Sequence, residues 1–357
     1  MAVQRARQLP LLLERRDWKK IDRATHCAVK PGRAQGKKPV TSRTSWTDRP
    51  HFVVNARGSR AATRRLAALR AHVERAFPHA AWEPTAEAGD AVSIARAAAE
   101  GGADLVVAVG GDGTVNEVVN GVLTASSTPP AIGILPAGSG SDLARTLRLP
   151  RDSIGAVDVL ARGRTRRIDV GEIECGPLDP RAPSSRTHRY FVNMAGCGAS
   201  GRVVEWFNRL RLAGAAGYGV AAALTAAGYK WPLVEMAFDA AAPRAVSLNL
   251  LFVCNGEYCG GGMRVGKGAR PDDGLLTVVE AGGVSRLRAL LQWPQLYLGG
   301  LHSVPGVRVQ DAGVVTVAGP TSVLVDCDGE LCGRLPATYR VVPRAIDVCV
   351  PGTTGQR

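Results

Sequence analysis

Val106-Val-Ala-Val-Gly-Gly-Asp-Gly-Thr-Val-Asn-Glu-Val-Val-Asn-Gly121 joins an apolar strand to a helix through a glycine turn that carries one carboxylate. Leu105 to Val109 form a mostly β-branched run of the kind that a parallel sheet buries on both faces. The turn glycines supply the backbone freedom for a sharp reversal. Asp112 is therefore expected at the carboxyl end of a strand, the edge where open α/β sheets bind ligands.

The helix after this turn is predicted to be capped by Thr114 and Asn116. Its free N–H groups and the positive end of its dipole would face a phosphate lying over the turn. An ordinary strand-to-helix connection would look the same, so a second element is needed. Ala131-Ile-Gly-Ile-Leu-Pro-Ala-Gly-Ser-Gly-Ser-Asp-Leu-Ala-Arg145 repeats the pattern, with a helix that opens at Asp142. Two adjacent loops of this kind can hold a nucleotide.

These residues resemble the diacylglycerol kinase catalytic-domain superfamily, in particular its soluble bacterial lipid kinases, with sphingosine and ceramide kinases as relatives. The resemblance extends over about residues 51 to 351 and rests on five motifs in the family's order and approximate spacing. They are Gly110-Gly-Asp-Gly-Thr-Val-Asn-Glu117, Leu135-Pro-Ala-Gly-Ser-Gly-Ser-Asp142, Gly260-Gly-Gly262, Asp273-Gly-Leu275 and Asp328-Gly-Glu330. Five ordered matches are far more specific than any one of them.

Strands alternate with helices over the first part of the sequence, which indicates a parallel sheet. His51–Asn55 is the first predicted strand, and Ala61–Phe77 and Ser93–Glu100 are the first two helices. After Arg162-Gly-Arg-Thr-Arg-Arg167 the pattern changes to short strands and turns, which favours a mostly antiparallel domain. The strands predicted there are Ile168–Ile173, Tyr190–Met194, Ala245–Cys254, Leu275–Glu280, Val314–Ala318 and Ser322–Cys327.

The expected fold is an α/β nucleotide-binding domain with a parallel sheet, like that of NAD kinase and phosphofructokinase, followed by the antiparallel domain. The resemblance implies that the second domain is a β-sandwich and that Ala345–Val350 returns to the first domain as a strand. The expected boundaries are a basic, disordered extension at 1–49, the α/β domain at 50–163 plus 343–357, and a lipid-substrate β-sandwich at 164–342.

The resemblance also implies an ATP site. The nucleotide contacts that it assigns are Asn55, Thr85, Gly110, Gly111, Asp112, Gly113, Thr114, Val115, Asn116 and Ser139. Ser139 stands where relatives usually carry Thr, and the change keeps the hydroxyl. The first-strand motif of the family, usually Asn-Pro before small residues and Gly, is here Asn55-Ala-Arg-Gly58 and lacks the proline.

Transfer of a γ-phosphoryl group to an alcohol requires an anchored nucleotide, a cation that offsets charge, and a carboxylate that accepts the hydroxyl proton. Asp328-Gly-Glu330 is the best candidate for the carboxylate, because a glycine flanked by acids at a strand end can present one of them to a cleft. The resemblance assigns proton acceptance to Glu330. Asp328 would orient Glu330 or help to hold the nucleotide-linked metal, and Asp112 would act near the phosphates and Mg²⁺. A polar turn with solvated acids is the alternative.

Arg270-Pro-Asp-Asp-Gly-Leu275 implies a separate, structural Mg²⁺ site. In the soluble bacterial relatives an Asp side chain and backbone carbonyls of this loop hold the cation. These ligands map to Asp273 and to the carbonyls of Arg270 and Leu275. Hard oxygen ligands with retained waters suit Mg²⁺. An Asp-Gly turn without a metal is the alternative.

The formal net charge of +14 is concentrated in residues 1–49, which hold 13 Lys/Arg against 4 Asp/Glu. This arm lacks sustained periodicity and is predicted to be disordered. It suits an anionic bilayer, where each basic residue can add about 1 kcal/mol, or nucleic acid. Composition does not separate these, and a solubilising extension is a third alternative. With the kinase motifs downstream, we expect peripheral contact with an anionic membrane and no nucleic-acid partner.

Other segments narrow the class of protein. The uncharged stretch Leu212 to Tyr229 is mostly Ala and Gly and is predicted to be a packed helix rather than a membrane span. Leu11-Leu-Leu13 is too short for a secretory signal, so a cytoplasmic location with transient membrane association is expected. The eight cysteines form no Cys-x-x-Cys pair. Gly261–Gly268 nearly fits a P-loop, but Gly268 stands where Ser or Thr is required.

The sequence predicts an ATP- and Mg²⁺-dependent lipid kinase that phosphorylates a primary hydroxyl, with diacylglycerol as leading acceptor and phosphatidic acid as product. A sphingoid- or ceramide-type lipid kinase, an NAD kinase, and a non-catalytic membrane- or nucleic-acid-binding protein on this fold are the alternatives. Trp206, Phe207, Tyr218 and Tyr229 could line an acyl channel or belong to the core. The oligomeric state, including a homo-oligomer, stays open.

Overall fold

The computed structural model describes residues 41–42, 46, 50–56, 60–138, 140–179, 181, 186–210, 214–282 and 293–352. Arg33–Arg357 form one compact unit. The helices described are α2 (Arg60–Ala76), α3 (Asp90–Glu100), α4 (Asp112–Leu123), α5 (Asp142–Thr146), α6 (Ser153–Ala161), α7 (Ala199–Arg209), α8 (Gly214–Gly228), α10 (Trp293–Leu298) and the 3-10 helix η2 (Leu301–Ser303). The first strands are β1 (Thr41–Ser42), β2 (His51–Asn55), β3 (Ala81–Thr85), β4 (Leu105–Gly110), β5 (Ala131–Pro136), β6 (Arg164–Gly176), β7 (Thr187–Phe191) and β8 (Met194–Gly198). The later strands are β9 (Leu233–Phe238), β10 (Arg244–Cys254), β11 (Leu276–Gly282), β12 (Val307–Ala312), β13 (Val314–Ala318), β14 (Leu324–Cys327) and β15 (Glu330–Cys349).

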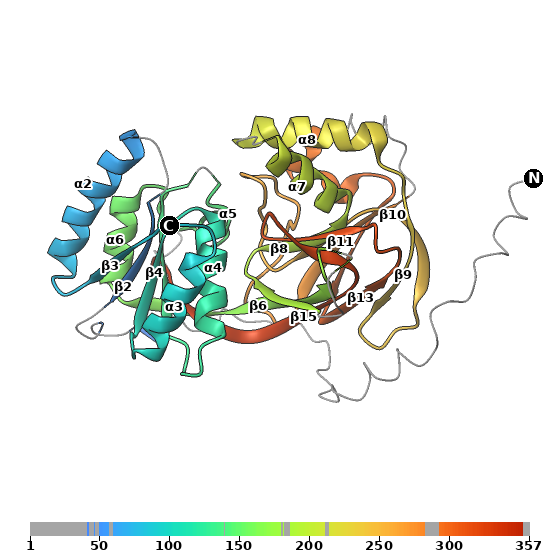
Figure 1. Ribbon diagram of the computed structural model, residues 1–357. Coiled ribbons are helices and arrows are strands. Elements are labelled where there is room, and N and C mark those ends of the chain that lie inside the picture. Colours follow the sequence, from blue (N-terminus) through green and yellow to red (C-terminus); the bar gives the residue numbers. More distant parts are fainter. Residues whose placement is uncertain are drawn as a thin grey trace, which may run out of the picture. The chain divides into compact units, whose positions relative to one another are not determined.

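The first part of the chain is built on parallel strands in the order β5-β4-β2-β3. β4 and β5 are buried along their whole lengths, which is why their sequences are apolar throughout rather than alternating. Helices α3 and α4 cover one face of this sheet, and α2 and α6 cover the other (Figure 1). The carboxyl ends of the four strands therefore meet at one edge of the sheet.

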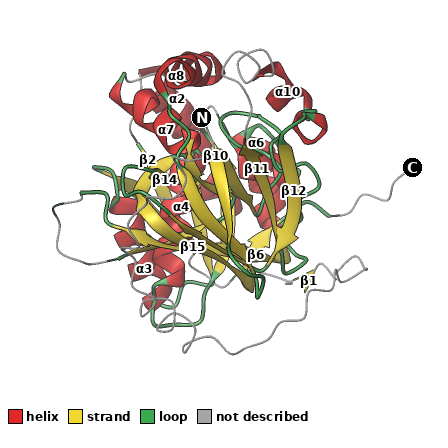
Figure 2. Ribbon diagram, turned by 90° about the vertical axis from the view of Figure 1, so that its right-hand side faces the viewer, coloured by secondary structure: helices red, strands yellow, loops and turns green. Residues whose placement is uncertain are grey.

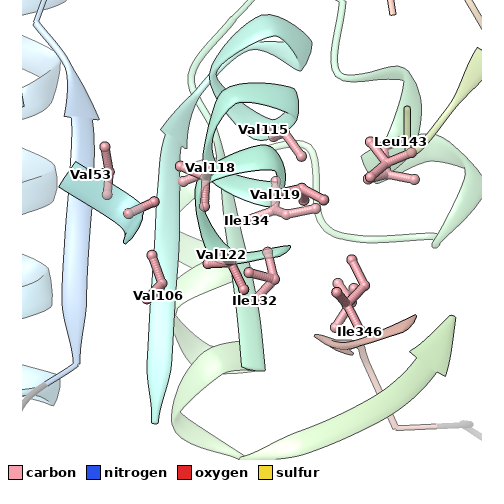
Figure 3. Packing of buried hydrophobic residues seen from close by; sticks show 14 of the residues in the cluster. Val53, Val106, Val115, Val118, Val119, Val122, Ile132, Ile134, Leu143 and Ile346 are labelled. Atoms are coloured by element: carbon pink, nitrogen blue, oxygen red, sulfur yellow. The ribbon is translucent and has the colours of Figure 1, made fainter. Parts of the chain in front are cut away.

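Successive side chains of each parallel strand enter opposite cores. Val53, Val106 and Ile132 pack against α4, whose Val118 and Val122 point toward them (Figure 3). Phe52, Val107 and Leu135 enter the core under α2 and α6. Each of these side chains is almost fully buried, and burying one contributes about 1.5–3 kcal/mol.

The second part is antiparallel. Strands β12, β11, β10, β8 and β14 pair in that order, and β9 and β13 connect β10 to β15. Their shared core contains Phe191, Leu248, Leu251 and Tyr339, all without measurable exposure. Helices α7 and α8 lie together on one side of these strands, above β10 and β14 (Figure 2).

Two long strands join the parallel and the antiparallel parts. β6 and β15 pair antiparallel from Gly176 and Arg334 to Thr165 and Cys349, with two irregular steps in the register (Figure 1). β15 then pairs in parallel with β5 at Val348 and Ile132. The predicted returning strand Ala345–Val350 is thus the end of a strand that starts at Glu330. One sheet runs through both parts. The expected boundary at 163/164 coincides with the start of β6, whereas the one at 342/343 falls inside the continuous strand β15.

Three expectations differ from the structure. The single strand predicted over Tyr190–Met194 is two strands, because the N–H groups of Val192 and Asn193 donate to the Asp328 carboxylate. Strands β9 and β12 were not predicted. The arm was expected to be disordered, but Thr41–Ser42 pairs with β6, and Trp46 Nε1 donates to the Leu160 carbonyl at 2.7 Å. The rest of residues 1–49 lies outside the described residues.

The uncharged stretch Leu212–Tyr229 forms helix α8 over Gly214–Gly228. In the part of the chain that the structure describes, no helix is long and apolar enough to cross a membrane.

Candidate active site

A cavity of about 740 Å³ lies where the carboxyl edge of the parallel sheet meets the β14–β15 turn and helices α7 and α8. Its polar wall contains Asn55, the two glycine-rich turns, Asp142 and Asp328–Glu330. The other wall is apolar. The cavity therefore joins a polar region suited to phosphates to a region suited to hydrocarbon.

The Gly-Gly-Asp-Gly turn forms the tip of the polar wall. Helix α4 begins at Asp112, with Gly111 as an extended N-cap residue that makes no side-chain cap. The prediction that Thr114 and Asn116 cap this helix is wrong, because the helix starts as soon as β4 ends and both residues lie inside it. Instead, Thr114 Oγ1 accepts a hydrogen bond of 3.2 Å from Asn55 Nδ2, which fixes the end of β2 against α4.

Two glycines, Gly138 and Gly140, allow the two turns to approach each other, and Gly110 allows α4 to start directly after β4. A Cβ on Gly138 would lie 2.5 Å from Gly111 Cα, and one on Gly140 would lie 2.5 Å from Asp112 Oδ2. A Cβ on Gly110 would lie 2.4 Å from Thr114 Oγ1. No real side chain tolerates such distances. The turns thus expose backbone rather than side chains to the cavity, as a phosphate cradle requires.

Asp112 connects the two turns. Its Oδ1 accepts hydrogen bonds from the N–H groups of Asp142 at 2.7 Å and Leu143 at 3.3 Å, so it caps helix α5. Burial raises the pKa of Asp112, although these N–H groups and Arg145 act in the opposite direction. Asp112 thereby fixes the second turn relative to the first.

Asp142 is a second acid on the same wall and is 3% exposed. Its Oδ2 accepts a hydrogen bond of 2.8 Å from Gly261 N–H, and its Oδ1 lies 3.6 Å from Arg145 Nε. Burial, and then the nearby charge of Asp112, raise the pKa of Asp142 to about 6. The segment Gly261–Gly268, which nearly fits a P-loop, thus contributes Gly261 to this wall. It forms turns, and no helix follows it.

Asp328 is the most highly bonded acid of the site. The turn holds it at φ 45°, followed by Gly329 at φ 85°. Oδ1 accepts from the N–H groups of Asn193 (3.1 Å) and Met194 (2.8 Å), and Oδ2 accepts from Val192 N–H (2.9 Å) and Asn116 Nδ2 (2.8 Å). Burial raises the pKa of Asp328 to about 6 against these bonds, which favour the charged form.

Glu330 is freer than Asp328. Its side chain is 45% exposed, and Oε2 lies 3.3 Å from Arg189 Nη1 on β7. A Cβ on Gly113 would lie 3.7 Å from Glu330 Oε1, so this carboxylate reaches the first turn of α4. The chain therefore places a half-exposed acid, Glu330, beside the first turn of α4, and a fully hydrogen-bonded acid, Asp328, behind it.

Some of the residues predicted to contact the nucleotide line the cavity, and others do not. Asn55, Gly111, Asp112 and Gly113 line the cavity, whereas Gly110, Thr114 and Asn116 lie behind that wall. Thr85 pairs with Asn55 across β2 and β3 and is buried, with no hydrogen bond to its Oγ1 from the described residues. Val115 points into the core of Figure 3, and its N–H donates to Gly111 O. Ser139 lies outside the described residues.

The apolar wall is formed by α7 and α8 against β10. Phe207 and Tyr218 line it with stacked rings whose centroids are 4.2 Å apart, opposite Leu250 and Phe252. Of the four aromatic candidates, Phe207, Tyr218 and Tyr229 line the cavity. Trp206 does not, and the Arg209 guanidinium lies 5.5 Å from its ring centroid.

The predicted magnesium loop lies away from the cavity. Asp273 Oδ1 accepts a hydrogen bond of 3.2 Å from Leu275 N–H, and Asp272 beside it pairs with Arg166 at 3.4 Å. Asp169 supports the loop by accepting a bond of 2.7 Å from Gly274 N–H. Among the described residues no group of three or more His, Cys, Asp or Glu could hold a metal. A cation here would need Asp273, carbonyls such as those of Arg270 and Leu275, and water, and this oxygen set fits Mg²⁺.

Comparison with known proteins agrees with this geometry. Residues 49–173 match the family described as diacylglycerol kinase catalytic domain, and residues 193–350 match the YegS C-terminal NAD kinase beta sandwich-like domain. A probable lipid kinase YegS-like protein of Chromohalobacter salexigens is 35% identical over 286 residues, 78% of this chain and 86% of that protein. A diacylglycerol kinase of Staphylococcus haemolyticus is 30% identical over 284 residues, 78% of this chain and 81% of that protein. The chain belongs to the diacylglycerol kinase family of lipid kinases.

Solved structures show the same fold for this lipid kinase. The crystal structure of a putative diacylglycerol kinase from Bacillus anthracis superimposes with a TM-score of 0.68 at 21% identity, covering 87% of this chain and all of that one. Yeast NADH kinase complexed with NADH gives a TM-score of 0.51 at 9% identity, covering 88% of this chain and 90% of that one. At these identities the likeness shows the fold alone, and an NAD kinase-like fold is what the sequence predicted.

Sequence reasoning missed two features of this lipid kinase. Asp142 was expected only to open a helix, although its place at the end of the Leu135–Asp142 motif could have marked it as a site residue. Asn193 and Arg189 border the catalytic turn, and their sequence neighbourhood carries no recognisable motif. Their position depends on where β7 ends, which the sequence pattern placed incorrectly.

Proposed function

We propose that this lipid kinase transfers the γ-phosphoryl group of ATP to a hydroxyl of a lipid, with diacylglycerol as the first acceptor to test. The observation that carries the proposal is the cavity itself. Its glycine turns and five acids, Asp112, Asp142, Asp326, Asp328 and Glu330, lie in one space with an apolar wall large enough for hydrocarbon. A purely water-soluble acceptor such as NAD would leave that apolar wall unused.

The nucleotide phosphates would lie over the Gly111 and Gly138 turns, at the N-terminus of α4. Backbone N–H groups and the helix dipole stabilise phosphate there. Asn55 would contact the nucleotide from the end of β2, and Thr85 would act from the end of β3. Ser139 belongs to the same proposal as a nucleotide contact that the family resemblance implies. Mg²⁺, when bound, would offset the charge that develops on the transferred group.

Glu330 would accept the proton of the lipid hydroxyl. It is the more exposed acid of the turn, and it reaches the first turn of α4. The hydroxyl oxygen forms a bond to the γ-phosphorus, the bond from that phosphorus to the β–γ bridging oxygen breaks, and ADP leaves. The proton passes to a Glu330 carboxylate oxygen.

Asp328 would position rather than catalyse. Both of its oxygens already accept two hydrogen bonds each, which leaves little room for a metal. Its role would be to hold the turn so that Glu330 faces the cradle. Asp112 would hold the second turn through α5 and lie near the phosphates.

The test is a product assay with labelled ATP, Mg²⁺ and a panel of dioleoylglycerol, sphingosine, ceramide and NAD. We expect a labelled lipid, and we expect Glu330→Gln to lower its formation by about 10²- to 10⁴-fold while ATP still binds. Labelled NAD would favour an NAD kinase instead. Near-normal turnover by Glu330→Gln would remove Glu330 as the base.

Peripheral association with an anionic membrane belongs to the same proposal, because a lipid acceptor must be reached at a bilayer. The excess of basic residues in 1–49 supports it. Deleting residues 1–48 should weaken co-sedimentation with vesicles that contain phosphatidylglycerol, with little effect on turnover of a short-chain acceptor. Unchanged sedimentation would leave the arm without that role.

A further inference from the structure

Asp326 is a buried acid in the cavity that the proposed chemistry does not use. It lies on β14, two residues before Asp328, lines the cavity and is 6% exposed. Its Oδ1 accepts a hydrogen bond of 2.6 Å from the hydroxyl of Ser200, the second residue of α7. A Cβ on Gly196 would lie 2.7 Å from Ser200 Oγ, so the pair fits closely over β8.

In the part of the chain that the structure describes, no cation pairs with the Asp326 carboxylate. Apart from the Ser200 hydroxyl and its own backbone N–H, no donor among these residues reaches it. The titratable groups that surround it are acids, thiols and phenols: Asp328, Cys197, Cys259, Cys327, Tyr218 and Tyr339. Buried carboxylates in proteins are normally paired or fully hydrogen-bonded. Among the described residues, Asp326 lacks that compensation.

The pair stands where the two regions of the cavity meet. Asp326 lies on β14 just before the Asp328–Glu330 turn. It lines the same cavity as Glu330, the acid that would accept the proton of the lipid hydroxyl. Ser200 begins the helix whose next turns contribute Val203, Val204 and Phe207 to the apolar wall. A lipid whose chains lie along α7 and whose hydroxyl faces Glu330 would therefore carry its intervening polar group past Asp326.

We propose that Asp326 and Ser200 form a subsite for a hydrogen-bond donor, a protonated amine or a second hydroxyl, that the lipid acceptor carries beside its reacting hydroxyl. The inference rests on the proposed function and narrows its acceptor. An amine fits best, because it supplies the positive charge that the chain withholds. A diacylglycerol has no donor apart from the reacting hydroxyl, so it leaves Asp326 unpaired.

The experiment compares acceptors within one series. Sphingosine offers an amine and a second hydroxyl, monooleoylglycerol offers a second hydroxyl alone, and dioleoylglycerol offers neither. The ratio of kcat/KM for each of the first two to that for dioleoylglycerol is measured in mixed micelles for the wild type, Asp326→Asn and Ser200→Ala. Asp311→Asn is the matched control, since Asp311 also accepts a hydroxyl bond, from Thr277 Oγ1 at 2.8 Å, but lies outside the cavity.

The wild type should favour a donor-bearing acceptor, and Asp326→Asn should lower that ratio by about 10- to 100-fold, the worth of a hydrogen bond to a charged group. Ser200→Ala should lower the ratio less, and Asp311→Asn should leave the ratio unchanged. A larger loss for sphingosine identifies the amine, and a larger loss for monooleoylglycerol identifies the hydroxyl. A ratio that Asp326→Asn leaves unchanged would overturn the subsite.

Failure of the proposed function is distinguished by a binding measurement that needs no turnover. If no lipid is phosphorylated, the shift of the melting temperature by sphingosine and by dioleoylglycerol still reports on the subsite. The inference requires sphingosine to stabilise the wild type more than Asp326→Asn, and equal shifts contradict it. If Asp326→Asn does not fold, Ser200→Ala carries the same comparison.

Discussion

The side-chain amide of Asn116 donates a hydrogen bond of 2.8 Å to Asp328 Oδ2, across 212 positions of sequence. Asn116 lies in the second turn of α4, the helix that begins at the Gly-Gly-Asp-Gly turn, and Asp328 lies in the β14–β15 turn. The same amide donates to the Tyr190 carbonyl at 2.9 Å. The side chain of Asn116 therefore links helix α4 both to the turn that carries Asp328 and Glu330 and to the end of β7.

We predict that Asn116→Leu, which keeps the branched shape of the side chain without its polar groups, lowers both stability and turnover. Asp328 and the Tyr190 carbonyl each lose a donor in a half-buried setting, which costs about 1–3 kcal/mol of unfolding free energy. Chemical denaturation and kcat measure the two effects. The control is Thr124→Val at the far end of α4, where the hydroxyl bonds to Asn120 O and to Arg96. A normal kcat in Asn116→Leu would show that the link does not position the acids.

This link also marks the limit of what sequence predicts. The strand–turn–helix units at Leu105–Leu123 and Ala131–Thr146 follow from local rules, since apolar runs, glycines and helix starts are read within a few residues. Two other details depend on partners far along the chain. Asp112 accepts a hydrogen bond from the first turn of the later helix α5 rather than from its own turn. Asp328 interrupts a predicted strand because its carboxylate accepts the N–H group of Val192.

Asp326 illustrates the same limit for function. In the sequence it is one residue of the predicted strand Ser322–Cys327, with no motif of its own. Only the fold brings Ser200 to it from 126 positions away and places both on the cavity wall. The family motifs could be recognised in the sequence from their residues and spacing. An acid such as Asp326, which lies within an ordinary strand, has no such pattern around it and could not be recognised.

Gly138→Ala should abolish tight nucleotide binding. The new Cβ would lie 2.5 Å from Gly111 Cα and 3.0 Å from Gly111 N, and because both are backbone atoms, no side chain can move to relieve the clash. The two turns must separate, which removes the cradle. Isothermal titration with ATP measures the effect. The matched control is Gly228→Ala, where an added Cβ meets nothing within 4 Å, and its ATP affinity should stay normal. Normal affinity in Gly138→Ala would contradict the assignment of these turns to the phosphates.

Asp273→Ala should reduce the stabilisation that Mg²⁺ gives. Asp273 is the one carboxylate of this loop that we assign to the cation, since its neighbour Asp272 pairs with Arg166. Its loss therefore removes the only charged ligand that we assign there. Thermal melts over a Mg²⁺ titration measure the effect. Asp179→Ala is the control, because Asp179 Oδ1 accepts from Arg181 N–H in a similar local turn, as Asp273 accepts from Leu275 N–H. Equal Mg²⁺ responses in the two variants would count against the site.

Asp326→Asn should make the protein more stable at pH 7.5 and not at pH 4. Burial raises the pKa of Asp326 to about 6 in the folded chain, against an ordinary value of 3.8. Between these values the unfolded chain loses the proton first, so the wild type loses stability as the pH rises through this window. Above about pH 6 the full effect is present, at most about 3 kcal/mol for a shift of this size. Asn stays neutral throughout and keeps an acceptor for Ser200.

Urea denaturation of the wild type and Asp326→Asn at pH 4, 5, 6 and 7.5 measures this difference. The gain should grow with pH, whereas Asp311→Asn, which removes an exposed carboxylate on β12, should give no comparable gain at pH 7.5. A difference that does not change with pH would mean that the Asp326 carboxylate is already compensated within the chain. A gain in stability of Asp326→Asn that rises with pH means that the Asp326 carboxylate destabilises the wild type at neutral pH. Such a cost is expected of a residue that is retained to bind a ligand.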